Sequence, residues 1–97
     1  MIVITGQIFT DKETYPELLA RLRALEEPSR AEDGCLFYHM AGQDPEKGVI
    51  LATEGWRDEE ALNAHLALPA IGKLLSDFEG KFHNDVNIHE VSSTRKM

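Results

Sequence analysis

The segment that decides the fold runs from Val49 to Leu66 and reads VILATEGWRDEEALNAHL. Its first part, as far as Trp56, is rich in apolar and β-branched residues and predicts a β-strand. Asp58 is a favourable N-cap residue, so a helix is expected to begin directly after it. One face of that helix carries Ala61, Leu62, His65 and Leu66. The segment therefore predicts a strand that leads straight into an amphipathic helix.

A second strand is predicted just upstream, over Cys35–Met40 (CLFYHM). Residues 43–48 (QDPEKG) have the composition of a turn, so the two strands are expected to form a hairpin. At the N-terminus, residues 2–9 (IVITGQIF) predict a further strand with apolar residues on both faces. Helices can cover only one of these faces, so a second sheet is the natural cover for the other.

Two helical segments complete the pattern. Residues 14–17 (TYPE) have the spacing of a capping box, with proline in the first turn, and an apolar stripe follows them. Pro28 is expected to end or kink this helix, and Gly34 to close the segment. The later helix should break at Leu68-Pro69, with a new stripe formed by Ile71, Leu74, Leu75, Phe78 and Phe82.

A last strand is predicted over Val86–Val91, followed by a polar tail over residues 92–97. The elements are then ordered β-α-β-β-α-β, without a linker or a low-complexity segment. This order predicts a single α+β domain over residues 1–97, with its core in residues 2–91. A chain of this length buries a thin core, which favours association with a second copy.

Composition excludes several classes of function. The net charge of −7 argues against nucleic-acid binding, because phosphate contacts need clustered Lys and Arg. Cys35 is the only cysteine, so no internal disulfide can form. The N-terminal MIVITGQIFT has no basic region of the kind that opens a signal peptide, and no apolar run approaches the ~20 residues of a membrane span. We expect a cytoplasmic protein without nucleic-acid or membrane partners.

His65 is the strongest candidate for chemistry, because it lies on an otherwise apolar helix face. An interior imidazole can act as a base near neutral pH. The alternative is a core histidine that hydrogen-bonds to Glu54 or to a backbone carbonyl. Glu54 and Trp56 share a strand face, so Trp56 could wall a ligand pocket or belong to core or dimer packing. Glu54 could orient His65 or pair with an arginine such as Arg57 or Arg30.

The second strand offers further candidates on two faces. Phe37 and His39 share one face and Tyr38 lies on the other, so either His39 or Tyr38 could reach a pocket. Alternation along one strand does not say which face is inside. No pair of His or Cys residues has metal-ligand spacing, and no glycine-rich phosphate loop is present, so we expect neither a metal nor a nucleotide cofactor.

From Ser29 onward the chain resembles the antibiotic biosynthesis monooxygenase family. The resemblance is carried by Ser29-Arg30, Gly34-Cys35-Leu36, Tyr38, the run Glu54-x-Trp56-x-Asp58-x-x-Ala61-x-x-x-His65, and Pro69. It implies a ferredoxin-like fold with an antiparallel sheet. It also implies a homodimer in which two sheets pack face to face as a dimeric α+β barrel, with a pocket between sheet and helices.

Some members of this family degrade haem, and here the chain departs from their pattern. The positions that match their asparagine, tryptophan and axial histidine hold Gln7, His65 and Leu75. Since leucine cannot bind iron, we expect no haem.

The resemblance and the residues lead to one main hypothesis, a cofactor-independent monooxygenase that oxidises a small quinol-like or polyphenolic aromatic with O₂. His65 would deprotonate the substrate, Trp56, Phe37 and Phe78 would form apolar walls, and Tyr38, His39 or Glu54 would guide the polar groups. Two alternatives stay open: an isomerase or degrading enzyme for a small polar signalling metabolite, and a non-catalytic ligand-binding or stress-related dimer.

Overall fold

The computed structural model describes residues 1–97 and confirms the predicted α+β fold. The strands are β1 (Ile2–Thr10), β2 (Cys35–Asp44), β3 (Val49–Trp56) and β4 (Phe82–Glu90). The helices are α1 (Tyr15–Ala24) and α2 (Glu26–Arg30) before the hairpin, and α3 (Glu59–Leu66) and α4 (Pro69–Asp77) after it. The strands form one antiparallel sheet in the order β2-β3-β1-β4, which is a ferredoxin-like arrangement.

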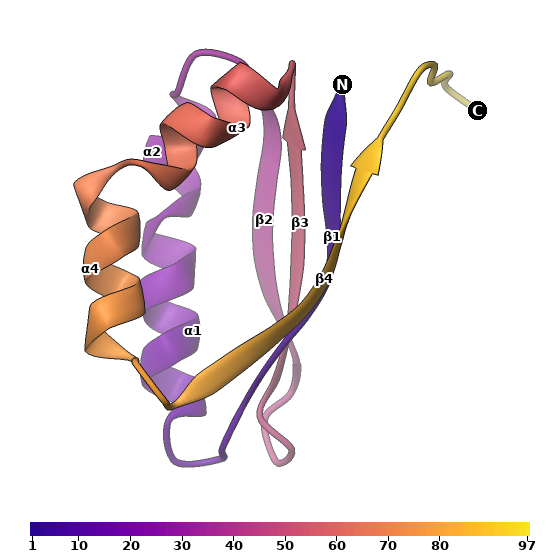
Figure 1. Cartoon of the computed structure of the whole chain (residues 1–97). Helices are drawn as coiled ribbons and strands as arrows, with labels where there is room; N and C mark the ends of the chain where they lie inside the picture. Colours follow the sequence, from indigo (N-terminus) through magenta and orange to yellow (C-terminus); the bar gives the residue numbers. More distant parts are fainter.

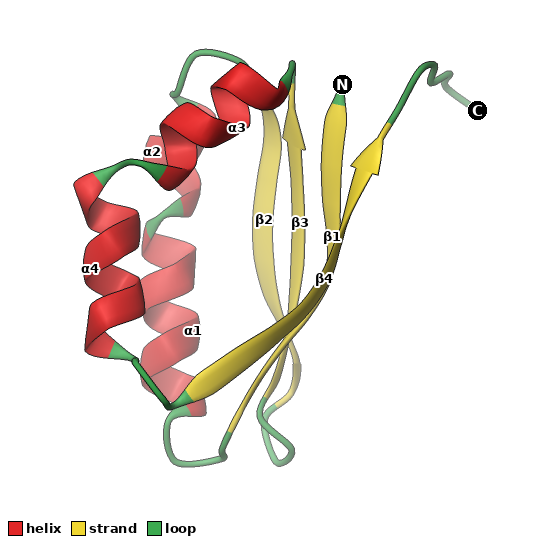
Figure 2. Ribbon diagram, in the orientation of Figure 1, coloured by secondary structure: helices red, strands yellow, loops and turns green.

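The molecule has two layers (Figure 1). All four helices lie on one face of the sheet, and the opposite face carries no helix (Figure 2). The core fills the space between the layers and is built from alternate strand residues and the apolar helix stripes. Its fully buried members include Leu18, Ile50 and Trp56. None of the helices combines the length and apolarity needed to cross a membrane.

The strand register places one line of residues straight across the helix-facing side of the sheet. Tyr38 of β2 pairs with Glu54 of β3, Glu54 pairs with Ile4 of β1, and Ile4 pairs with Ile88 of β4. Directly opposite residues on paired strands share a face, so these four side chains point to the same side. We call them the cross-sheet row.

Two strand boundaries differ from the sequence expectation. β4 begins at Phe82 rather than at Val86, so Phe82 belongs to the strand and not to the helix stripe. Residues 83–85 (HND) lack strand propensity, but they pair with residues 7–9 of β1 as part of the continuous β1–β4 ladder, which outweighs the local preference. β2 continues past Met40 to Asp44, because its register shift near Gly42 keeps it paired with β3.

The helix starts show which caps were predictable. Asp58 caps α3 as expected, with its carboxylate accepting from the Ala61 amide at 2.9 Å. The capping box expected at Thr14 is wrong, because the Thr14 side chain makes no cap hydrogen bond. Instead the Asp11 carboxylate accepts from the Thr14 amide at 2.7 Å and closes the turn before α1. Gly34 has φ +86°, the left-handed conformation expected of it.

Candidate functional site

A cavity of about 420 Å³ lies between the helices and the sheet. This volume falls in the range of small-molecule sites. Four polar or charged side chains face it from different elements: Tyr38 (β2), Glu54 (β3), His65 (α3) and Asn84 (β4). The rest of the lining is apolar and consists of Ile4, Ile8, Leu22, Leu25, Met40, Ala52, Leu62, Leu66, Ile71, Leu74, Leu75, Phe82, Val86 and Ile88.

His65 is held in one orientation by a carboxylate. Its Nδ1 lies 2.9 Å from Oε2 of Glu32, and the two side chains are 3% and 19% exposed. A carboxylate only accepts hydrogen bonds, so Nδ1 carries the hydrogen. A neutral His65 ring therefore has its lone pair on Nε2, and His65 is one of the residues that line the cavity.

Two aromatic rings fix the plane of the imidazole. The Trp56 ring lies against it with 4.6 Å between centroids, and Tyr38 meets it edge-on at 5.4 Å. Trp56 is completely buried, and its Nε1 donates to Oε1 of Glu54 at 3.0 Å. Trp56 therefore packs against the His65 ring and, through its hydrogen bond to Glu54, connects the histidine to this second carboxylate of the site.

The low polarity of the site changes the acid–base behaviour of its groups. Burial raises the pKa of the Glu54 carboxyl, although the Trp56 hydrogen bond and the nearby His65 act in the opposite direction. Burial, and then the charge of Glu54, raise the pKa of the Tyr38 phenol well above its ordinary range. Tyr38 consequently keeps its proton and can act only as a neutral hydroxyl at this end of the cavity.

Cys35, the single thiol, lies near the same carboxylates but outside the cavity. Burial and the charges of Glu32 and Glu54 raise its pKa. Since a thiol with a raised pKa is a poor nucleophile, the structure gives no support to thiolate chemistry here.

The structure brings together four of the seven residues singled out in the sequence: His65, Trp56, Tyr38 and Glu54. Phe37 and His39 stack on each other on the open face of the sheet, away from this cavity. Phe78 is buried at the end of α4 with the Arg21 guanidinium above its ring, and it does not line the cavity. Trp56 does not line it either.

The partner of His65 is the main residue that sequence reasoning missed. Glu32 lies in the turn between α2 and β2, where an acidic residue looks like ordinary solvated loop. Glu54, the partner considered from the sequence, is occupied by Trp56 and pairs with neither Arg57 nor Arg30. Glu32 and His65 are 33 positions apart, so no local spacing could have indicated the contact.

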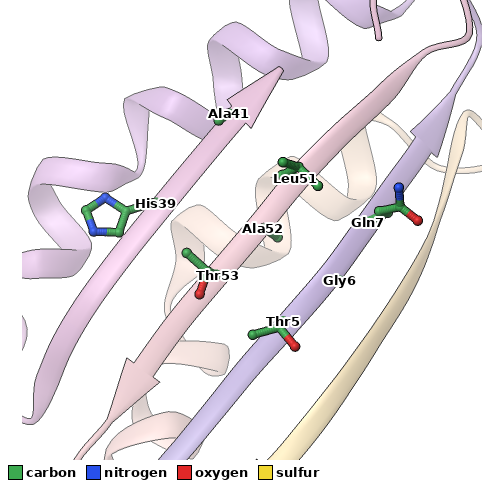
Figure 3. A pocket seen from close by; sticks show the side chains of 8 residues that line it. All are labelled: Thr5, Gly6, Gln7, His39, Ala41, Leu51, Ala52 and Thr53. Carbon is green, nitrogen blue, oxygen red and sulfur yellow. The ribbon is translucent and has the colours of Figure 1, made fainter. Parts of the chain in front are cut away.

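A second hollow, of about 490 Å³, lies on the open face of the sheet (Figure 3). Its lining includes the side chains of Thr5, Gln7, His39, Leu51 and Thr53, all on β1, β2 and β3. This hollow is a stretch of sheet surface between long side chains, and it contains no carboxylate beside a histidine. The cavity under the helices is therefore the stronger candidate for chemistry, even though the hollow is larger.

The residues of the cavity do not fit haem as the haem-degrading relatives bind it. Leu75 lines the cavity with a side chain that has no ligating atom. Gln7 lies on the other side of the sheet, where its amide donates to Gln43 at 2.8 Å.

Comparison with known proteins agrees with this architecture. Residues 1–75 match the family model described as antibiotic biosynthesis monooxygenase. The chain is 34% identical over 68 residues to the uncharacterised protein sll1783 of Synechocystis, covering 70% of this chain and 46% of that protein. It is 32% identical over 65 residues to YcnE of Bacillus subtilis, a candidate monooxygenase by name, covering 67% and 68% of the two chains.

The chain thus spans about half the length of sll1783 and of YjcS of Bacillus subtilis, of which it covers 46% and 55%. Among solved structures, a protein from Deinococcus radiodurans assigned to the antibiotic biosynthesis monooxygenases superimposes with a TM-score of 0.87 at 24% identity, covering 100% of this chain and 98% of that one. Rv0793 from Mycobacterium tuberculosis superimposes with a TM-score of 0.85 at 21% identity, covering 98% of each chain. These likenesses establish the fold, and the family model matches most of the chain. The protein belongs to the antibiotic biosynthesis monooxygenase family.

Proposed function

We propose that this protein is a cofactor-independent monooxygenase that oxidises a phenol or quinol with O₂, with His65 as the general base. The observation that carries the proposal is the Glu32–His65 pair at the polar end of an otherwise apolar cavity. Family membership supports the reaction class, and the pair supplies the group that such a reaction needs.

The first step is proton removal from the substrate hydroxyl. Nε2 of His65 accepts the proton, and the Glu32 carboxylate stabilises the imidazolium that forms, because it already accepts from Nδ1. Tyr38 lines the same cavity with its ring edge-on to His65, and its hydroxyl is hydrogen-bonded to Ser29. This neutral hydroxyl would donate to the phenolate oxygen as its charge develops. The apolar walls exclude water from the electron-rich anion.

Oxygen then reacts with a ring carbon of the anion that carries hydrogen. A C–O bond forms to give a hydroperoxide, and breaking its O–O bond with loss of water leaves a carbonyl at that carbon. One oxygen atom enters the product and the other leaves as water with two hydrogens from the substrate. The substrate thereby supplies all four electrons, so no external reductant is required.

The composition of the cavity favours this reaction over the two alternatives. Its aliphatic lining suits an aromatic substrate better than a small polar metabolite, for which it offers few partners. A volume of about 420 Å³ also argues against a domain whose interior is packed shut.

We further propose that the protein works as a homodimer through the open face of its sheet. That face carries half-buried Val3 and Phe37 and the exposed Leu51, with no helix to cover them. A second sheet would bury this surface, as in sheet-on-sheet packing generally. Cytoplasmic location is part of the same proposal and rests on Cys35 being the only cysteine, since the chain then uses no internal disulfide.

Oxygen uptake with a panel of reduced quinones and anthrols tests the catalytic proposal. His65→Phe keeps a ring against Trp56 and Tyr38 but removes both nitrogens, and we expect turnover to fall by about 10²–10⁴-fold. His83→Phe is the matched control: this histidine stacks on Phe9 and lies outside the cavity, so activity should be retained. A His65→Phe protein with unchanged turnover would remove His65 from the mechanism.

A further inference from the structure

The cavity changes character along the cross-sheet row. Tyr38 and Glu54, with His65 above them, form a polar inner end over β2 and β3. Ile4 and Ile88 continue the row over β1 and β4 with aliphatic side chains only. Asn84, the remaining polar residue of the lining, pairs with Ile8 of β1 and so lies outside the row. A ligand lying along the row itself would therefore meet hydrogen-bonding groups at one end and hydrocarbon at the other.

The aliphatic end opens to solvent. Leu66, Leu75 and Ile88 all line the cavity, yet they are 55%, 51% and 62% exposed. Large apolar side chains that stay this exposed around an opening suggest an apolar ligand group that covers them. Ile88 belongs to β4, the edge strand of the sheet, so the exposed part of the lining reaches the β4 edge.

A small residue lies beside the row on the cavity side of the sheet. Ala52 of β3 lines the cavity two positions from Glu54, so it shares the face of Glu54. Its β1 partner is Gly6, which has no side chain to fill the space next to Ala52. A Cβ at Gly6 would collide with the backbone of Asp85 and Val86. Small residues at these two paired positions leave room for a chain between the polar end and the opening.

We infer that the cavity binds an amphipathic phenol: a phenolic ring beside His65, Tyr38 and Glu54, and an aliphatic substituent that runs along the row and leaves past Leu75 and Ile88. The phenolic head rests on the proposed function, whereas the aliphatic tail rests on the lining alone. The three exposed side chains at the opening, Leu66, Leu75 and Ile88, are branched aliphatics, so they suit a flexible chain better than a further fused ring.

The row also sets the length of the tail. From β3 to β4 the distance is two inter-strand spacings, roughly 10 Å, which about seven methylenes span. Each methylene that leaves water completely raises affinity about fourfold. We therefore expect affinity to rise two- to fourfold per carbon up to about seven carbons and then to level off, because later carbons lie in solvent.

Binding of 4-alkylphenols, from methyl to nonyl, tests this inference under nitrogen, where turnover cannot interfere. Trp56 is the only tryptophan and touches His65, so its fluorescence reports on the polar end. Leu75→Asn and Ile88→Asn should each reduce the dependence on chain length while leaving 4-methylphenol affinity within about twofold. Leu68→Asn is the control. Leu68 is an exposed leucine (38%) directly before α4, the helix that carries Leu75, and it does not line the cavity.

The outcomes separate this inference from the proposed function. Saturable binding of 4-methylphenol without dependence on chain length would overturn the tail and leave the phenol site standing. The same would follow if the dependence persisted in both asparagine variants, or if a rigid three-ring phenol bound tighter than every alkylphenol. If the chain-length dependence is found but His65→Phe turns over normally, the amphipathic site stands and the proposed mechanism fails.

Discussion

Removing Glu32 should separate the role of His65 in catalysis from its role in packing. In Glu32→Ala, the imidazole loses the acceptor on Nδ1, which lies 2.9 Å away in a site where the two side chains are 3% and 19% exposed. A hydrogen bond to a charged group in such surroundings contributes about 1.5–3 kcal/mol to the free energy of unfolding. For a domain of this size that loss lowers the melting temperature by roughly 6–24 °C.

The catalytic effect has a different origin. Without Glu32, the hydrogen on the neutral ring is no longer held on Nδ1, so Nε2 is less often the free base. Removing the carboxylate that orients a catalytic histidine costs from about 10-fold to about 10⁴-fold, and here we expect that loss in kcat rather than in KM. Oxygen uptake with a competent quinol measures it.

A double-mutant cycle with His65→Phe supplies the refutation. In the His65→Phe background there is no Nδ1–H to accept, so Glu32→Ala should cost at most a few tenths of a kcal/mol. Urea unfolding followed by Trp56 fluorescence gives all four free energies of unfolding. If the losses in free energy of unfolding of the two single variants simply add in the double variant, the Glu32–His65 hydrogen bond contributes no coupling energy. The proposal that Glu32 holds His65 as the base would then be wrong.

Three further predictions follow from the fold and the site. Burial raises the pKa of Glu54, so the stability that this carboxyl contributes is present below its ordinary pKa of 4.5 and is lost as pH rises through the raised pKa. In Glu54→Gln the side-chain oxygen can still accept from Trp56, and the variant should gain stability over the wild type as pH increases from about 4 to 7. A difference in stability that stays constant with pH would contradict the raised pKa. Ile50→Asp places a charge at a fully buried position and should lower the free energy of unfolding by several kcal/mol, so circular dichroism should show loss of cooperative unfolding. The control Ile50→Val should lower it by only about 0.5–1.5 kcal/mol. Light scattering at micromolar concentration should give the mass of two chains, and a monodisperse monomer would refute the proposed homodimer.

Local sequence was enough to predict the order of elements and part of the site. Asp58 and Gly34 adopt the cap and the left-handed turn that their residue types favour, because such preferences depend on the neighbouring backbone alone. Helical spacing likewise placed His65 on the inner face of α3. Strand alternation placed Glu54 and Trp56 on one side of β3, where the structure joins them by a hydrogen bond.

Tertiary structure decided which groups meet. Alternation along β2 separates Tyr38 from His39, but only the packing of the helices shows that Tyr38 faces the cavity and His39 the open face. The strand character of residues 83–85 comes from their ladder to β1, and the partner of His65 comes from a turn 33 positions away. The physical reason is the range of each signal. Periodicity and capping act within one element, whereas a contact between elements depends on how separate parts of the chain are brought together by the fold.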